Sequence, residues 1–228
     1  MGFFMFDSYF IILILPALIF SFYAQYKVKS TFNKYQKQRT ATGKTGADIA
    51  RELLDNNGLS DVSIENVPGQ LSDHYDPRKR VVRLSASVYG NSSVAAAGVA
   101  AHETGHAIQH KEGYLPLVLR STLVPAAGIG SSFGPWMTIF GLIFSNDFLL
   151  NVGIILFSVA VLFYIVTLPV EFNASSRAIY SLERDRILAH EEIIPVKKVL
   201  NAAAMTYVAS AAVALASLLR LLLLRGRR

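Results

Sequence analysis

Four long apolar runs, separated by polar segments, dominate the pattern of the chain. Together they contain only two charged residues, Asp7 in the first run and Arg120 in the second. Each run reaches the roughly 20 residues that an α-helix needs to cross the hydrocarbon core of a bilayer. The pattern therefore predicts an α-helical integral membrane protein with three to four transmembrane helices. The runs lie at residues 3–24, 115–144, 148–170 and 199–219.

The polar segments give an expected order of domains. The first is long enough for a small α+β module, and the second predicts a helical segment between two apolar runs. Prolines and glycines in the second apolar run can kink it, which a membrane helix tolerates when neighbours cover its backbone. We expect transmembrane helices over 3–25, 116–144 and 148–169, a cytoplasmic module over 27–115, a cytoplasmic helical segment over 170–198 and a C-terminal apolar helix over 199–224.

Within the polar module, helix and strand patterns follow one another. Thr45 can cap a helix that ends at Gly58, and Ser92 stands near the start of a second helix that is rich in small residues. Between them lie three strand-like stretches, the last two joined by an Asp-Pro turn that favours a hairpin. The last strand is either an edge to which an extended peptide can add or an ordinary part of the sheet. The stretches cover 62–67, 71–75 and 80–84.

Positive charge is unevenly distributed among the polar segments. Residues 27–115 include 12 Lys and Arg and residues 170–200 include five, whereas the turn 145–147 has none. Because basic residues favour the cytoplasmic side of a membrane, both polar segments are predicted to be cytoplasmic and the N-terminus to lie outside. A fourth crossing by 199–219 would place the basic C-terminal tail outside, against this tendency. The alternative is that this run does not cross fully.

The composition agrees with a membrane protein and excludes several kinds of site. Hydrophobic residues make up 52% of the chain and charged residues 17%, against about 25% charged in an average soluble domain. The net charge of +6 comes from basic residues that border apolar runs, so we expect the lipid bilayer as a partner and no nucleic acid. The absence of cysteine excludes a thiolate metal site, a disulfide framework and a cysteine nucleophile.

A His-Glu-x-x-His sequence at 102–106 is the strongest chemical signal in the chain. On an α-helix, residues four apart lie on one face, about one turn apart. His102 and His106 can therefore bind one Zn²⁺ ion, and Glu103 lies close enough to act as a general base on a metal-activated water. The bare motif is short enough to occur by chance, in which case it marks two histidines on a half-buried helix.

A catalytic zinc ion takes three protein ligands and keeps one position open, so a third ligand is needed. Glu171 is the best candidate, because a hairpin of the second and third apolar runs would return it to the membrane face of the motif. The alternative is a solvated acid at the start of a helix, where a carboxylate is favoured in any case. His110 is a less favoured ligand, because it lies one further turn along the helix axis.

Three more side chains are candidates for contacts with a substrate or an oxyanion. His74 lies in a predicted strand, and Arg177 and Tyr180 follow the candidate ligand Glu171 by six and nine residues. Each could donate a hydrogen bond to the negative charge that develops on a carbonyl oxygen during hydrolysis. The alternative for each is an ordinary surface position on its strand or helix.

With these residues placed, the chain resembles a known family, the YugP-like, membrane-bound neutral zinc metallopeptidases of prokaryotes. The resemblance implies that His102, His106 and Glu171 are zinc ligands and that Glu103 is the general base. It also implies a gluzincin-type site, a zincin-like fold for the α+β cytoplasmic module, and a plan similar to that of the HtpX-type and CAAX prenyl proteases. The strings that carry it are 45–47 with 57–59, 71–77, 98–110, 113–117 and 168–175.

One position departs from the wider gluzincin pattern. Those enzymes often have an Asp four residues after the ligand Glu, where it orients a zinc-binding histidine, and this chain has Ser175 there. A neutral hydroxyl is a weaker partner for such a histidine. We therefore expect another group to orient it, with Asp73 and Asp76 as candidates.

These observations predict a zinc-dependent endopeptidase that holds one Zn²⁺ ion. We expect a multi-pass protein of the cell membrane, with its active site on the cytoplasmic side and a peptide or membrane protein as substrate. One alternative is cleavage within the membrane, which the polar module disfavours. Another is a proteolytically silent, zinc-containing membrane scaffold or partner protein. Structural zinc usually has four protein ligands, so three ligands and an intact Glu103 favour catalysis.

Overall fold

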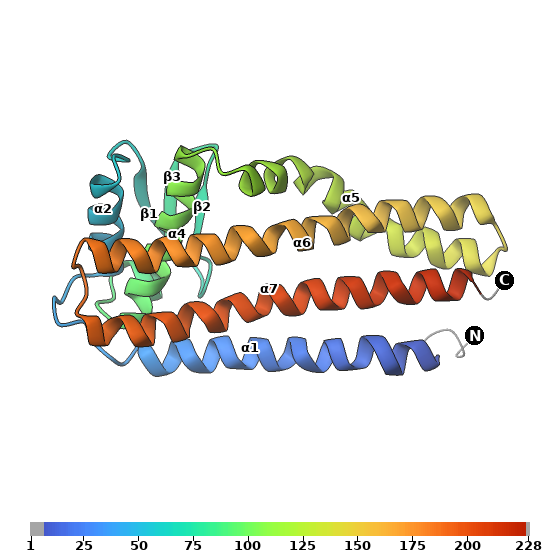
Figure 1. The fold of residues 1–228 in the computed structure, drawn as a ribbon, viewed down its shortest axis with the longest axis horizontal. Coiled ribbons are helices and arrows are strands. Elements are labelled where there is room, and N and C mark those ends of the chain that lie inside the picture. Colours follow the sequence, from blue (N-terminus) through green and yellow to red (C-terminus); the bar gives the residue numbers. More distant parts are fainter. Residues whose placement is uncertain (1–6, 227–228) are drawn as a thin grey trace. The chain divides into compact units, whose positions relative to one another are not determined.

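Four long helices carry the apolar runs of the chain (Figure 1). The computed structural model describes residues 7–226. Helix α1 (Leu15–Tyr35) follows a short π-helix at Phe10–Ile14, and the other three are α5 (Leu115–Ile143), α6 (Asp147–Arg184) and α7 (His190–Arg225). Within the described part of the chain, these four helices are long and apolar enough to cross a membrane. The sequence-based expectation of a helical membrane protein is therefore supported, and the fourth run has the length to cross.

The helices extend well beyond the apolar runs. Helix α6 continues through the polar segment to Arg184, and α7 begins at His190, before its apolar run starts. Pro125 and Pro135 lie inside α5, which stays one helix over its whole range and changes direction along its course in Figure 1. Residues 3–6 of the expected first helix lie outside the described residues.

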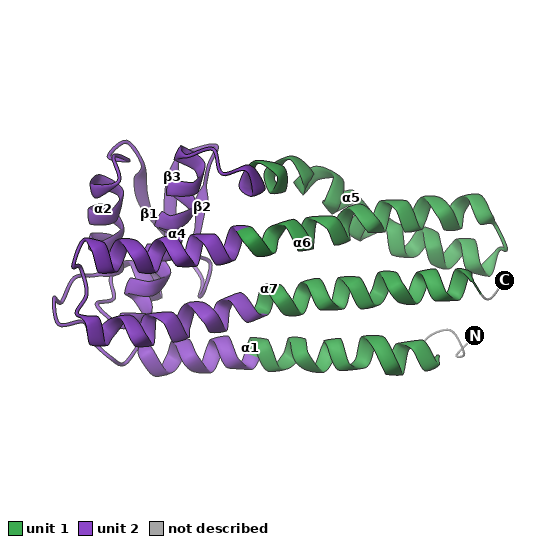
Figure 2. Cartoon of the chain, viewed as in Figure 1, with its two compact units in different colours: residues 1–25, 118–169, 206–228 green, residues 26–117, 170–205 purple. Residues whose placement is uncertain are grey.

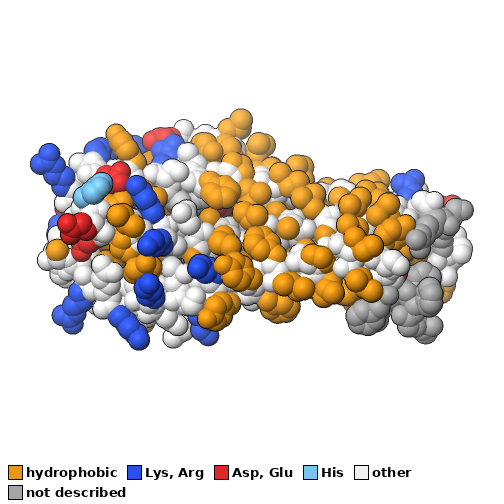
Figure 3. All heavy atoms as spheres, turned by 60° about the horizontal axis from the view of Figure 1, so that its bottom comes forward, with side chains coloured by type: hydrophobic (Ala, Val, Ile, Leu, Met, Phe, Trp, Pro, Cys, Tyr) orange, Lys and Arg blue, Asp and Glu red, His pale blue; other side chains and the backbone are white. Residues whose placement is uncertain are grey.

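The chain is divided into two units (Figure 2). Unit 1 comprises residues 1–25, 118–169 and 206–228, and unit 2 comprises residues 26–117 and 170–205. Unit 1 contains the most apolar portions of the long helices, and apolar side chains cover much of its visible surface in Figure 3. Unit 2 displays many Lys and Arg side chains in the same view. This distribution is typical of a membrane-embedded unit and a water-exposed unit.

Glycines allow the helices of unit 1 to approach closely. A Cβ atom at Gly134 of α5 would lie 2.8 Å from the backbone nitrogen of Phe157 in α6, and one at Gly130 would meet the Leu156 carbonyl. Small residues are the usual means of close packing between membrane helices, where apolar side chains gain little by leaving lipid. Seven buried apolar residues form a cluster in this unit: Leu150, Ile154, Phe157, Ala160, Val161, Ala214 and Leu221.

An ion pair links the start of the described chain to the end of α7 within unit 1. Nη2 of Arg220 lies 3.0 Å from Oδ2 of Asp7, and both side chains are largely shielded from solvent. Asp7 also accepts a hydrogen bond from the backbone N–H of Phe10. Because a charged side chain among membrane helices is costly unless it is paired, this contact holds together two segments from opposite ends of the sequence.

Three short strands form the sheet of unit 2. Strand β1 (Ser63–Val67) pairs in parallel with β3 (Val81–Ser85), and β2 (His74–Asp76) pairs antiparallel with β3. The predicted hairpin is confirmed, and the Asp76 carboxylate accepts two backbone N–H groups of its turn. The edge interpretation of the last strand is wrong, because β1 crosses over to pair with the other side of β3. The outer strands of the sheet are β1 and β2.

Helices pack with this sheet to form the core of unit 2. Helix α2 (Gly46–Asn56) begins at a capping box in which Thr45 and Asp48 exchange hydrogen bonds. A short helix that the sequence did not predict, α3 (Ala86–Tyr89), follows β3 directly, and α4 (Val94–Lys111) carries the histidine motif. One core cluster joins α2, α4 and the sheet, and its largest buried members include Leu54, Leu59, Val62, Val82 and Leu84.

Candidate metal centre

Helix α4 is buried along most of its length, which sets the motif on a rigid element. The hydroxyl of Ser93 accepts the backbone N–H of Ala96 and caps the helix. The small side chains of the following two turns allow neighbouring elements to pack closely around the helix. As a result Glu103 and His106 are buried although they are polar. A buried polar group needs partners, and those partners define the site.

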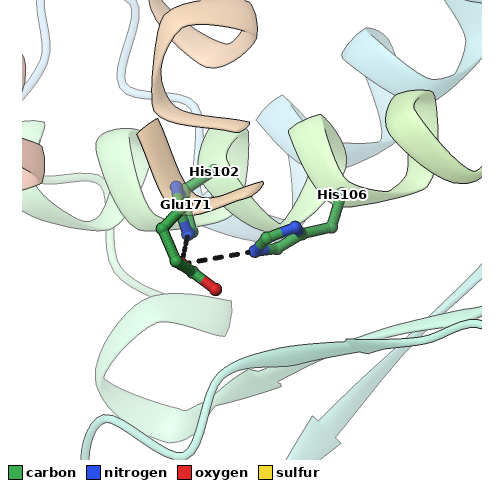
Figure 4. Close-up of side chains that lie close together, drawn as sticks. All are labelled: His102, His106 and Glu171. Atoms are coloured by element: carbon green, nitrogen blue, oxygen red, sulfur yellow. Dashed lines mark hydrogen bonds and ion pairs between the residues drawn. The ribbon is translucent and has the colours of Figure 1, made fainter. Parts of the chain in front are cut away.

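The three predicted metal ligands converge in unit 2 (Figure 4). Oε2 of Glu171 lies 3.3 Å from Nε2 of His102 and 3.7 Å from Nε2 of His106. The two imidazole rings are nearly perpendicular, at 80°, with centroids 4.8 Å apart. Glu171 is only 2% exposed, so its carboxylate faces the histidines and is shielded from solvent. Two residues of α4 and one of α6, 65 positions further along, thus form one cluster.

These separations fit a tetrahedral zinc site. Bonds of about 2.1 Å at tetrahedral angles separate neighbouring ligand atoms by about 3.4 Å. The two nitrogen–oxygen distances, 3.3 and 3.7 Å, lie on either side of that value, and all three ligand atoms lie within 4.8 Å of one another. Two imidazole nitrogens and one carboxylate oxygen are also a common ligand set for catalytic zinc. The residues present could therefore hold this metal.

The electrostatics of the cluster favour a positive charge. Burial by itself would lower the pKa of His106, because it disfavours the imidazolium form. The nearby carboxylates of Glu171 and Glu103 outweigh burial, and the pKa of His106 is raised above its ordinary value. A cation that binds between these side chains would receive the same stabilisation.

The Glu103 carboxylate is available for chemistry. It is 7% exposed and lies close enough to His106 to influence the charge of that ring. Among residues 7–226, no side chain or backbone group forms a hydrogen bond with it. A general base must have a lone pair free to take a proton, so the position and environment of Glu103 suit that role.

Ser175 occupies the position from which a carboxylate would orient His102. Its hydroxyl oxygen lies 3.1 Å from Nδ1 of His102. Asp73 instead accepts hydrogen bonds from the backbone and hydroxyl of Ser85, and Asp76 pairs with Arg83. The expectation that Asp73 or Asp76 orients a ligand histidine is therefore wrong. The shorter side chain of Ser175 reaches His102 because α6 lies close to α4.

Comparison with known proteins identifies the family. Over residues 10–226, the chain matches the family described as "putative neutral zinc metallopeptidase". The chain belongs to this family. It is also 50% identical over 220 residues to the "putative membrane protease YugP" of Bacillus subtilis strain 168, and the alignment covers 96% of this chain and 98% of that protein. No solved structure matches the chain. The family resemblance noted in the sequence is thus confirmed, and the family implies zinc.

Two other candidates on α6, Arg177 and Tyr180, contact side chains other than the three potential ligands. Arg177 pairs with Glu112 at 2.7 Å and donates to Asn173. Tyr180 is 62% exposed, with the guanidinium of Arg184 over its ring. Their proposed contacts with an oxyanion stay predictions.

Two histidines of the chain lie on the sheet side of α4. His74 is exposed on the outer strand β2, with its Nδ1 2.8 Å from the Ser72 carbonyl oxygen. His110 is exposed and its Nδ1 lies 2.9 Å from the hydroxyl of Tyr75. The cluster of potential ligands contains neither residue. The contact between His110 and Tyr75 places β2 beside the last turns of the motif helix.

Sequence reasoning missed a residue that contacts the second histidine. Gln109 is fully buried, and its Oε1 lies 3.0 Å from Nδ1 of His106. Its Nε2 donates to the Val170 carbonyl at 2.8 Å and to Oδ1 of Asn173 at 3.0 Å. A signal was available, since glutamine three residues after a ligand lies on the same helix face.

Proposed function

We propose that this protein is a zinc-dependent endopeptidase that hydrolyses peptide bonds at the cytoplasmic face of the membrane. The observation that carries the proposal is the convergence of His102, His106 and Glu171. Glu103 lies beside them, and its carboxylate forms no hydrogen bond with any of the described residues. Membership of a zinc metallopeptidase family and the likeness to a membrane protease support the reaction type. The basic residues of unit 2 support the cytoplasmic location.

The residues of the site have distinct roles in this proposal. His102, His106 and Glu171 would hold the zinc ion, which when bound acidifies water and polarises a carbonyl group. Glu103 would take a proton from the attacking water and pass it to the leaving amine. Its burial keeps bulk water from competing for that proton. Three protein ligands leave a fourth position open, which a structural site would fill.

The sheet offers a way to present the substrate. Strand β2 is an outer strand, so an extended peptide could pair with its free side and lie along α4. The 2.9 Å contact between Tyr75 of β2 and His110 of α4 supports the proximity of this strand to the motif helix. Among the candidates for substrate contacts, His74 is exposed on β2 and would therefore lie nearest to a peptide bound at that strand.

Replacement of the base tests the reaction directly. The full chain, purified in detergent and loaded with zinc, would be incubated near neutral pH with a peptide library, and products would be identified by mass spectrometry. Glu103→Gln should retain zinc and lose hydrolysis by about 10²–10⁴-fold, the usual contribution of a general base. Glu52→Gln, which alters a half-buried acid of α2 that pairs with Lys44, is the matched control.

Two outcomes would contradict the proposal. Equal hydrolysis by the wild type and Glu103→Gln would show that this carboxylate is not the base. Stoichiometric zinc with no hydrolysis of any library member by either protein would favour the alternative of a proteolytically silent membrane scaffold.

A further inference from the structure

We propose that Gln109 is a positioning residue that holds His106 in the form able to bind the metal. The inference rests on the proposed zinc site, because it concerns how that site is prepared. Neutral imidazole carries its proton on one nitrogen, and only the other nitrogen can bind a metal. For Nε2 of His106 to face the ion, the proton must be on Nδ1. Gln109 contacts that Nδ1.

The orientation of the Gln109 amide follows from its other partners. The Val170 carbonyl, 2.8 Å from Nε2, can only accept a hydrogen bond, so the NH₂ group must face it. Oε1 is then the atom that faces His106, at 3.0 Å. An oxygen can only accept, so Nδ1 of His106 must donate, and in the neutral ring Nε2 then carries the lone pair that can bind a metal.

A second series of hydrogen bonds favours the same orientation of the Gln109 amide. The Arg177 guanidinium can only donate, and its Nε lies 2.6 Å from Oδ1 of Asn173. Asn173 therefore presents its oxygen, and the Gln109 NH₂ group donates to that oxygen at 3.0 Å. The ion pair of Arg177 with Glu112 at 2.7 Å holds the guanidinium in place. The Val170 carbonyl, which can only accept, and the Arg177 guanidinium, which can only donate, thus impose one orientation on the Gln109 amide.

Burial makes this arrangement specific to Gln109. The side chain is fully buried, so water cannot replace a lost partner, and both of its polar atoms are used. By contrast, Ser175 is only partly buried, and its hydroxyl can both donate and accept. It can therefore form a hydrogen bond with Nδ1 of His102 whether or not that nitrogen carries the proton. The arrangement also gives Arg177 a positioning role, transmitted through Asn173.

Zinc affinity and the spectrum of a cobalt-substituted site test the inference without relying on activity. Gln109→Leu removes both the acceptor and the donors at similar volume, and it should weaken zinc binding by about 10–100-fold, the usual effect of losing an outer partner of a ligand histidine. The visible absorption of the Co²⁺ form should shift as the ligand geometry changes. Gln109→Glu retains an acceptor for Nδ1–H and should recover part of the affinity.

The matched control is Thr104→Val. Thr104 is fully buried on the same helix, and its hydroxyl donates only to the Ala100 carbonyl. This variant should keep the zinc affinity and cobalt spectrum of the wild type. Asn173→Ala, which leaves the Val170 contact of Gln109 intact, should weaken binding less than Gln109→Leu. If Gln109→Leu does not fold, the zinc affinities of the other variants test the inference. Weaker binding by Asn173→Ala than by Thr104→Val supports it, and equal affinities of Gln109→Glu, Asn173→Ala and Thr104→Val overturn it.

The failure of this inference differs from the failure of the proposed function. Wild-type zinc affinity and an unchanged cobalt spectrum in folded Gln109 and Asn173 variants would overturn the positioning role and leave the peptidase proposal intact. A wild-type protein that binds no zinc would overturn the proposed function, and with it the reason for this inference.

Discussion

Gly105 of α4 lies directly against the main-chain carbonyl of Ala174 in α6. A Cβ atom at Gly105 would stand 2.5 Å from the Ala174 oxygen and 3.1 Å from its carbon, closer than any side chain can fit. The glycine lies between the two histidines of the motif, and Ala174 lies between Glu171 and Ser175. The absence of one side chain thus allows the two metal-binding segments to meet.

Gly105→Ala should therefore push α6 from α4 and weaken zinc binding. Alanine is favoured over glycine inside a helix by about 1 kcal/mol, so a loss of affinity or stability would come from the clash. We expect at least a tenfold rise in the zinc dissociation constant, measured by chelator competition.

Gly98→Ala on the same helix is the control for this prediction. Its Cβ would lie 3.3 Å from a methyl group of Val196, and a side chain can shift where a backbone carbonyl cannot. Zinc affinity of Gly98→Ala should stay near that of the wild type. Equal affinities in all three proteins would show that the contact of Gly105 with Ala174 does not control the distance between the ligands.

Removal of the third ligand should abolish tight zinc binding while the protein still folds. Glu171→Ala should cost more than the roughly 10–100-fold expected for an outer partner of a ligand, and Glu171→Gln tests the same point at nearly constant volume. Zinc content after dialysis is the measurement. Glu183→Ala, further along α6 in an exposed pair with Lys197, should keep its zinc, and full zinc retention in Glu171→Ala would disprove the ligand assignment.

Ser175 offers a gain-of-affinity test. A carboxylate accepts a stronger hydrogen bond from imidazole than a hydroxyl does, because the bond is charge-assisted. Ser175→Asp should therefore tighten zinc binding, whereas Ser175→Ala should weaken it. Ser176→Ala, which removes only a bond to the Phe172 carbonyl, should change nothing. The same affinity in the Asp and Ala variants would show that Nδ1 of His102 does not depend on this side chain.

The ion pair of Asp7 and Arg220 should contribute to the stability of unit 1. Removing one partner of a shielded pair is destabilising, because the remaining charge loses its counter-ion. Arg220→Met and Asp7→Asn should each lower the thermal unfolding temperature in detergent. The double variant should be more stable than the sum of the single effects predicts, and strict additivity would argue against a direct pair.

The proposed topology can be examined with single cysteines, because the natural chain has none. Ser60→Cys in the polar module should be protected from a membrane-impermeant maleimide in intact cells and become labelled after permeabilisation. Phe144→Cys, at an exposed position after α5, should be labelled without permeabilisation. The reverse pattern would place the metal site on the outer side of the membrane.

The sequence alone predicted the parts of the protein that depend on local pattern. Apolar runs of sufficient length predict membrane helices because the bilayer thickness sets a length. The spacing of His102 and His106 predicts a shared face because the helix period is 3.6 residues. The hairpin between β2 and β3 follows from its turn residues. Each of these signals lies within one element or one tight turn.

Other features depend on which distant segments meet, and the local pattern carries little information about that. The central place of β3 follows from the parallel crossover of β1, which no turn residue indicates. Ser175 contacts His102, and Asp73 does not, because helix packing sets those distances. The position of the ring proton that Gln109 imposes on His106 depends on Val170, more than 60 positions away. The sequence supplied the ligands, and only the tertiary structure, through the close contact of Gly105 with α6, decided that they meet in one buried cluster.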